Sequence, residues 1–188
     1  MAVLPILITG DPVLHTPASA VTEFDDALHQ LVADMIETMK AAPGVGLAAP
    51  QVGRSLRVFV FDWTDDEGVH SHGVAINPEI WITPVPTGTP DEEAEAEGCL
   101  SIPGERYPLR RAQHTILRAV DPTGYPFEVT ASGWLARIFQ HEYDHLDGVL
   151  FADRLDHASG RAAQKAIRKN GWGVPELSWQ PGLDHLEG

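Results

Sequence analysis

Residues 132–148 read SGWLARIFQHEYDHLDG, and this stretch decides the organisation of the chain. It predicts a helix over residues 132–146, which Gly148 ends in the usual position of a C-terminal glycine cap. His141 and His145 stand four residues apart, so both imidazoles lie on one face of this helix. We therefore expect the rest of the fold to pack around this central helix.

Further helices and strands flank the motif helix on both sides in the sequence. An N-terminal helix is predicted over residues 25–41, where apolar residues recur at steps of three and four, and a C-terminal helix over residues 155–169. Short stretches rich in β-branched or aromatic residues predict strands at 56–61, 113–121 and 127–130. Strands in a run between helices indicate an α+β fold with mainly antiparallel sheets around the central helix.

The composition is that of an ordinary globular domain. The chain has 188 residues, of which 43% are apolar and 21% charged. We assign residues 1–170 to a single catalytic domain and residues 171–188 to a tail whose role the sequence does not decide. The apolar run at residues 3–8 is too short to cross a bilayer and no basic stretch precedes it, so we expect a cytoplasmic protein with no membrane segment.

The charge balance limits the possible partners. A formal net charge of −14 argues against general or sequence-specific affinity for nucleic acid, because phosphate binding needs clustered Lys and Arg. One exception is a basic face on the predicted C-terminal helix, formed by Arg161, Lys165, Arg168 and Lys169. A solvated helix face is the favoured interpretation of such a run.

The motif helix carries the strongest chemical signal. His141 and His145 are spaced to bind one metal ion, and Glu142 lies beside them as a candidate proton acceptor. The alternative is a pair of helical histidines satisfied by hydrogen bonds. A catalytic metal site needs a third protein ligand, and Cys99 offers the one thiolate of the chain.

Cys99 stands in EGCLSIPG, residues 97–104. A lone cysteine is more often an inert buried residue, but its neighbours favour a functional site here. Gly98 permits close backbone approach, and a turn predicted at residues 101–104 would aim the amide N–H of Leu100 at a developing oxyanion.

A third segment, GVGLAAPQVG at residues 44–53, is rich in small residues. Its glycines and alanines let a backbone approach a ligand closely, and Gln51 offers a neutral amide donor, although tight packing explains such a segment equally well. It lacks the Lys and the Ser or Thr of a P-loop, which argues against a phosphate cradle.

Taken in order, GVGLAAPQ, EGCLS and QHEYDHLDG resemble the three signature motifs of the peptide deformylase family. The resemblance implies a metal-dependent hydrolase that removes the formyl group from the N-formylmethionine of new polypeptides and releases formate. It implies Cys99, His141 and His145 as ligands of one divalent ion, Fe²⁺ in the cell, with Zn²⁺, Ni²⁺ or Co²⁺ as compatible substitutes.

The resemblance also assigns roles to other residues. Glu142 is expected to act as general base and then as acid, while Gln51 and the Leu100 amide stabilise the oxyanion. Glu97 is expected to pair with Arg111, for which a weak surface ion contact is the alternative. The expected substrate-binding residues are Val45, Gly46, Gly98 and Ile138.

The methionine pocket is expected along the motif helix. Ile138 lies one turn before His141 and faces the same way, so it would line an apolar pocket. Arg137 is expected to add a charge near the rim of that pocket, where some relatives carry an aliphatic residue. By contrast, His70 and His72 are interpreted as surface residues of a hairpin loop.

Three alternatives stay open at this point. A zinc metalloprotease shares the His-Glu-x-x-His helix, but its third ligand usually lies downstream, whereas Cys99 lies upstream. A metal-stabilised binding protein without catalysis is disfavoured by the intact Glu142. A deformylase of a specialised small N-formyl substrate fits the same motifs. Because deformylases meet their substrates at the ribosome, the basic helix face is a candidate for a transient ribosomal contact.

Overall fold

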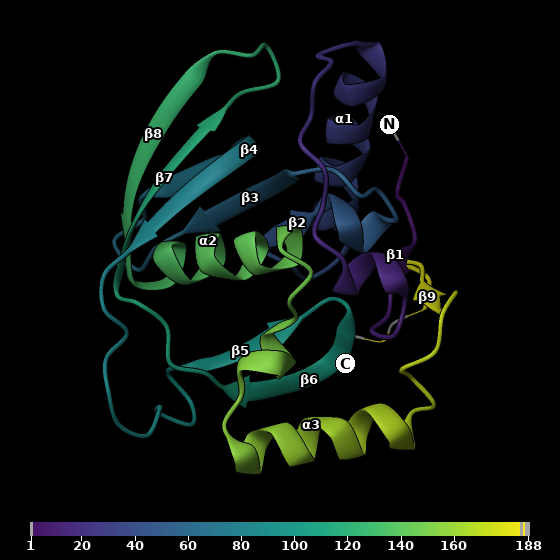
Figure 1. The fold of residues 1–188 in the computed structure, drawn as a ribbon, viewed down its shortest axis with the longest axis vertical. Helices are drawn as coiled ribbons and strands as arrows, with labels where there is room; N and C mark the ends of the chain where they lie inside the picture. Colours follow the sequence, from purple (N-terminus) through teal and green to yellow (C-terminus); the bar gives the residue numbers. More distant parts are fainter. Residues whose placement is uncertain (1, 185, 187–188) are drawn as a thin grey trace.

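The motif helix lies at the centre of the molecule. In the computed structural model, which describes residues 2–184 and 186, helix α2 (Gly133–Leu146) lies between a five-stranded sheet and a two-stranded sheet (Figure 1). The large sheet has the order β2-β3-β4-β7-β8 and is antiparallel throughout. Its strands are β2 (Gly46–Ala48), β3 (Val58–Thr64), β4 (His70–Ile82), β7 (His114–Val120) and β8 (Pro126–Ser132).

The two-stranded sheet carries the cysteine. Strands β5 (Ala96–Cys99) and β6 (Ile102–Pro108) form an antiparallel hairpin below α2 in Figure 1. Cys99 is paired with Ile102, so the chain turns at Leu100 and Ser101. The turn predicted at residues 101–104 is therefore placed too late in the sequence, because β6 already begins at Ile102.

An apolar core holds α2 against the large sheet. Phe139 of α2 is fully buried and packs edge-on against Phe61 of β3, with ring centroids 4.9 Å apart. Phe59 belongs to the same cluster, with its ring centroid 6.1 Å from that of Phe139. Burial of each such side chain contributes about 1.5–3 kcal/mol, so this cluster fixes the position of the motif helix.

The other helices cover the outside. Helix α1 (Asp26–Ala41) begins at its N-cap Asp25, whose carboxylate accepts the backbone N–H of Leu28 at 3.0 Å. Helix α3 (His157–Lys169) buries little more than Ala163 and Ile167, so most of its surface faces solvent. Among the described helices, none combines the length and apolar character that a bilayer span requires.

The two ends of the chain lie together. Strand β1 (Ile6–Leu7) pairs antiparallel with β9 (Ser178–Trp179), seen as adjacent purple and yellow arrows in Figure 1. Trp179 is only 3% exposed and belongs to the same apolar cluster as α1. The tail thus packs onto the body of the protein, while the boundary drawn at residue 170 stays a prediction. Residues 185, 187 and 188 of that tail lie outside the described residues.

The expected α+β fold with mainly antiparallel sheets is confirmed. All three predicted helices are present, but β2, β4, β5 and β6 were not expected. His70 and His72 lie within β4, so their placement in a hairpin loop is wrong. The strand continues through this segment because seven residues of β3 find antiparallel partners along it.

Candidate metal centre and substrate pocket

Three donor atoms converge at the centre of the fold. Cys99 ends β5, while His141 and His145 project from successive turns of α2. The Sγ atom of Cys99 lies 3.3 Å from Nε2 of His145, which lies 3.2 Å from Nε2 of His141. Among the residues described, this is the one group of three or more His, Cys, Asp or Glu side chains with donor atoms close enough to share an ion.

The donor set fits a single divalent metal ion. One thiolate and two imidazoles give three protein ligands, the number typical of catalytic sites, which leaves a further coordination position open. Burial and the neighbouring His141 lower the pKa of His145 well below its ordinary value, which favours the neutral, ligating form. In His141, burial acts in the same direction, but Cys99 and Glu97 outweigh it and raise the pKa.

Glu97 holds His141 in the ligating orientation. Its Oε1 atom lies 2.7 Å from Nδ1 of His141. An ionised carboxylate can only accept hydrogen bonds, so Nδ1 of His141 must be the donor. In the neutral imidazole the other ring nitrogen, Nε2, then carries no proton and faces the metal centre. The same carboxylate accepts hydrogen bonds from Arg111 at 2.7 and 3.1 Å and from Arg137 at 2.9 Å. Burial alone would raise the pKa of Glu97, but the His141 and Arg111 contacts hold it well below its ordinary value.

This ion network extends to a second buried carboxylate. Arg111 donates to Asp144 of α2 at 2.6 Å, and Arg154 donates to the same carboxylate at 2.5 and 2.6 Å. The expected pair of Glu97 and Arg111 is present, but it is buried, so the alternative of a surface ion contact is wrong. The network ties β5 and the short helix at residues 151–154 to the motif helix.

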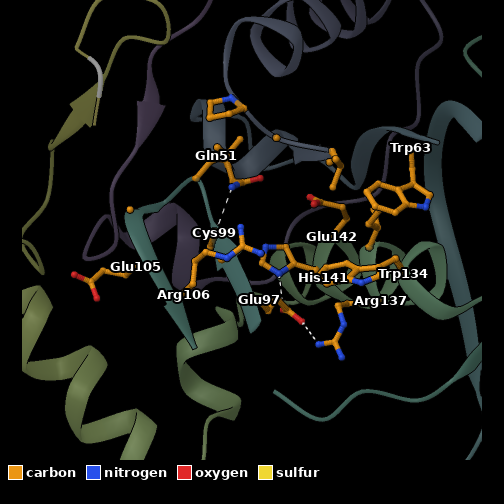
Figure 2. Close-up of a pocket in the computed structure, with 18 residues that line it drawn as sticks. Gln51, Trp63, Glu97, Cys99, Glu105, Arg106, Trp134, Arg137, His141 and Glu142 are labelled. Carbon is orange, nitrogen blue, oxygen red and sulfur yellow. Dashed lines mark hydrogen bonds and ion pairs between the residues drawn. The ribbon is translucent and has the colours of Figure 1, made fainter. Parts of the chain in front are cut away.

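Glu142 lies on the opposite side of the centre from Glu97 (Figure 2). It is 4% exposed, and burial raises its pKa to about 7. A Cβ atom at Gly46 would lie 2.2 Å from Oε1 of Glu142, so the glycine is what allows this close approach. Within the described part of the chain, Oε2 has no hydrogen-bond partner and is therefore available to a small reactant.

Gln51 connects the small-residue segment to the cysteine. It lies in the short helix η2 (Ala49–Val52), and its Oε1 accepts the backbone N–H of Ala48 at 2.8 Å. That bond turns the amide NH₂ towards Cys99, with Nε2 3.7 Å from Sγ and 3.3 Å from Oγ of Ser101. The backbone N–H of Ser101 also donates to Sγ at 3.4 Å.

A pocket of about 400 Å³ opens beside the metal centre. The four expected substrate-binding residues, Val45, Gly46, Gly98 and Ile138, all line it. Trp63 and Trp134 also line it, with ring centroids 6.1 Å apart (Figure 2). Trp134 could have been predicted as a pocket residue, because it lies one turn before Ile138 on the same helix. Trp63 comes from β3, and no pattern in the sequence places it at the pocket.

Arg137 lines the pocket but does not leave a free charge at its rim. The side chain is buried and donates to the backbone oxygen of Leu109 at 2.7 Å and to Glu97 at 2.9 Å. Its guanidinium also lies over the ring of Trp134, with the Cζ atom 5.2 Å from the ring centroid, within the roughly 6 Å reach of a cation–π contact. The expected change in pocket polarity is therefore smaller than the sequence indicates, since the charge is neutralised within the ion network.

Two other candidates lie away from this centre. His70 is exposed, its Nε2 atom lies within hydrogen-bond distance of Asp62 at 2.7 Å, and its ring stacks on His72. The basic face of α3, formed by Arg161, Lys165, Arg168 and Lys169, is also exposed. Neither belongs to the metal centre.

Comparisons with known proteins agree on one family. The family model described as "Polypeptide deformylase" matches residues 3–161. The chain is 49% identical to a peptide deformylase of Mycobacterium marinum over 97% of this chain and 96% of the relative. A solved peptide deformylase from Legionella pneumophila superposes with a TM-score of 0.76 at 40% identity, covering 90% of this chain and 96% of that one. One from Synechococcus elongatus, solved in complex with actinonin, gives 0.75 at 38% identity, covering 93% and 91%.

Proposed function

Because the chain belongs to the polypeptide deformylase family and thus removes the N-formyl group from new polypeptides, we propose how its residues divide the work of that hydrolysis. The observation that carries the proposal is the convergence of Cys99, His141 and His145 beside Glu142, next to the pocket. The reaction adds water to the formyl carbon, breaks its bond to nitrogen, and yields formate and a free amine.

Cys99, His141 and His145 would hold the metal ion. When bound, a divalent ion supplies a Lewis acid that makes water easier to deprotonate and the formyl carbonyl more electrophilic. We propose Fe²⁺ as the ion in the cell, which the mixed thiolate and imidazole donors allow as well as Zn²⁺, Ni²⁺ or Co²⁺. Anaerobic purification followed by elemental analysis tests this: one equivalent of iron supports the proposal, and zinc alone contradicts it.

Glu142 moves the proton. In the first half of the reaction its carboxylate takes a proton from the attacking water as the new carbon–oxygen bond forms. In the second half it gives that proton to the amide nitrogen as the carbon–nitrogen bond breaks. Its buried position and unpartnered Oε2 support this role, since no protein donor competes for that oxygen among the residues described.

Gln51 and the backbone N–H of Leu100 stabilise the oxygen that becomes negatively charged. Both lie in the wall of the pocket beside Cys99. Gln51 is held by the N–H of Ala48, which presets its NH₂ group towards the centre. A preset donor costs no reorganisation during the reaction, which is why such groups accelerate acyl transfer.

The substrate backbone lies along β2. This strand is at the edge of the large sheet and pairs with β3 on one side only. Gly46 therefore offers its free side to an extended peptide, as in other cases of strand addition. Val45 and Gly98 line the same cleft, and Ile138 and Trp134 form the wall against which an apolar methionine side chain packs.

Release of formate is the direct test of substrate class. The metal-loaded protein should release formate from a formyl-Met peptide and leave the matched acetyl-Met peptide intact. Cleavage of an internal peptide bond in either would indicate the metalloprotease alternative. Turnover of free N-formyl amino acids that exceeds turnover of formyl peptides would indicate a specialised small substrate.

The exposed basic face of α3 is a candidate for contact with ribosomal RNA. Its four cations, at residues 161, 165, 168 and 169, stand out on a protein of net charge −14. We infer a transient contact in the cytoplasm, where new chains emerge. Charge reversal at Lys165 and Arg168 should abolish cosedimentation with ribosomes at low salt. Charge reversal at Arg118 on β7 is the control. Equal cosedimentation of the two variants would contradict the inferred contact.

A further inference from the structure

The peptide unit between Leu100 and Ser101 is held from two sides. Its carbonyl oxygen, that of Leu100, accepts a hydrogen bond of 2.8 Å from the indole Nε1 of Trp179, which lies 79 residues further along the chain. Its N–H, that of Ser101, donates to Sγ of Cys99 at 3.4 Å. One rigid peptide plane thus links the tail directly to the metal-ligating sulfur.

The tail is itself firmly anchored where it makes this contact. Trp179 stands opposite Ile6 in the β1-β9 pair, and the N–H of Ile8 donates to the carbonyl of Leu177 at 2.9 Å. One step along, the N–H of Thr9 donates to the carbonyl of Ser101 at 2.8 Å. The two ends of the chain therefore hold two successive carbonyls of the catalytic turn.

The approach of the tail to the N-terminal segment is close. The N–H of Gly173 donates to the carbonyl of Thr9 at 2.9 Å. A Cβ atom at Gly10 would lie 2.2 Å from the backbone of Gly173, and Gly10 has a φ of +107°. Residues 173–179 of the tail therefore contact the N-terminal segment through backbone hydrogen bonds.

Leu100 is also confined on its pocket side. Its side chain is 7% exposed, and a Cβ atom at Gly44 would lie 2.8 Å from its Cδ1 atom. The residue is therefore held between the pocket wall and Trp179. A rotation of the Leu100–Ser101 peptide would move the Ser101 N–H that donates to the Cys99 sulfur. Through the Cα atom of Leu100 it would also displace the preceding peptide, which carries the Leu100 N–H.

We propose that Trp179 is a positioning residue for deformylation: its indole N–H fixes the Leu100–Ser101 peptide, whose N–H donates to the Cys99 sulfur. The adjoining peptide carries the Leu100 N–H, so the same bond also holds the oxyanion donor in place. The tail from residue 173 to 179 is then part of the catalytic unit. This inference rests on the role proposed above for the Leu100 amide. A tail that only adds apolar packing would stabilise the fold without affecting the chemical step.

The test uses the full chain with Trp179→Phe, which removes the N–H donor and keeps an aromatic ring. A second variant replaces Trp179 by benzothienylalanine, whose sulfur substitutes for the N–H at nearly unchanged shape. Trp172→Phe is the matched control, because Trp172 packs on the same apolar cluster and its backbone N–H, which the change leaves intact, donates to Ile167.

Loss of one such hydrogen bond should lower kcat by about tenfold, with KM for a formyl-Met peptide nearly unchanged. The visible absorption of the Co²⁺-loaded variants, which reports the thiolate–metal bond, should shift in the Trp179 variants and not in the control. Wild-type kcat and spectrum in the benzothienylalanine protein would overturn the inference. Equal losses in Trp172→Phe would overturn it as well. Formate release by the wild type in the same assay tests the reaction itself.

Discussion

Oε1 of Glu97 lies 2.7 Å from Nδ1 of His141, and two buried arginines hold the same carboxylate from the other side. The orientation of the His141 imidazole, a candidate metal ligand, therefore depends on a residue outside the set of Cys99, His141 and His145.

Glu97→Gln should weaken metal binding by about 10–100-fold, because a neutral amide is a poorer acceptor for the His141 N–H and leaves the arginines undercompensated. Competition with a chromogenic chelator measures this affinity. Glu105→Gln is the control, since Glu105 also lines the pocket but pairs with Tyr107 instead of a ligand. Unchanged affinity in Glu97→Gln would show that Glu97 does not orient His141.

Glu142→Gln should lower kcat by about 10²–10⁴-fold while the protein keeps its metal, because the amide cannot shuttle a proton but occupies the same space. Formate release and elemental analysis of one sample measure both quantities. Glu128→Gln, at an exposed residue of β8, should be neutral. A Glu142→Gln enzyme that retains metal and full activity would refute the proposed proton transfer.

Gly46→Ala should reduce activity sharply, because the added Cβ would lie 2.2 Å from Oε1 of Glu142 and must displace that carboxylate. Gly160→Ala is the matched control: its Cβ would meet Leu155 only at 3.9 Å, and alanine favours the helix by up to about 1 kcal/mol. Formate release and thermal unfolding of the two variants separate the effects. Full activity of Gly46→Ala would show that Glu142 does not need its observed position.

Removal of the metal should lower Tm as well as abolish activity, because an ion that binds only the folded state stabilises it, by about 2.7 kcal/mol at a hundred times its Kd. Scans with and without a chelator measure the shift, and Fe²⁺ or Co²⁺ added without oxygen should reverse it. Cys99→Ser, which weakens the ligand set, should show a smaller shift. Equal shifts in both proteins would argue that the ion binds elsewhere.

The N-terminus of α3 should give an acid-dependent contribution to stability. Asp156 accepts the backbone N–H groups of Ala158 and Ser159 at 2.9 and 2.8 Å, and the Ser159 bond lowers the pKa of Asp156 below its ordinary value of 3.8. Because the pKa is lower in the folded state, the contribution is complete above pH 3.8 and is lost as the pH falls through the folded value.

Asp156→Asn keeps a capping side chain without a titrating group, so it is the natural comparison. The Tm advantage of the wild type over this variant should be constant near neutral pH and should shrink under acid conditions. An advantage that stays constant to low pH would contradict the assigned pKa direction. Since Asp156 is neither a candidate ligand nor part of the pocket lining, formate release at neutral pH should be equal in the two proteins.

Much of the metal centre was predictable because it depends on local spacing. A helix places residues four apart on one face, so His141 and His145 converge wherever that helix forms. Burial of Phe139 on the same helix then determines which face of the helix packs against the large sheet. Cys99 could be proposed because a catalytic metal site needs a third protein ligand and a thiolate is a suitable one, although no local pattern showed how close Cys99 lies to the histidines.

Strand boundaries were predicted less well, for a physical reason. Strands β2 and β5 have three and four residues, too few to show a period of two, and they exist because partner strands satisfy their backbone groups. The turn at Leu100 and Ser101 depends likewise on the pairing of Cys99 with Ile102. Pairing between strands is a property of the assembled chain.

The sequence by itself determined the helices and indicated the candidate ligands and the candidate proton acceptor, because these follow from side-chain chemistry and from spacing along one helix. Only the tertiary structure decided that Arg137 turns to Glu97, that Trp63 joins the pocket, and that Trp179 reaches the Leu100 carbonyl. Each of these contacts joins segments tens of residues apart. Their distance is set by how sheets and helix pack together, and no local pattern of residues encodes it.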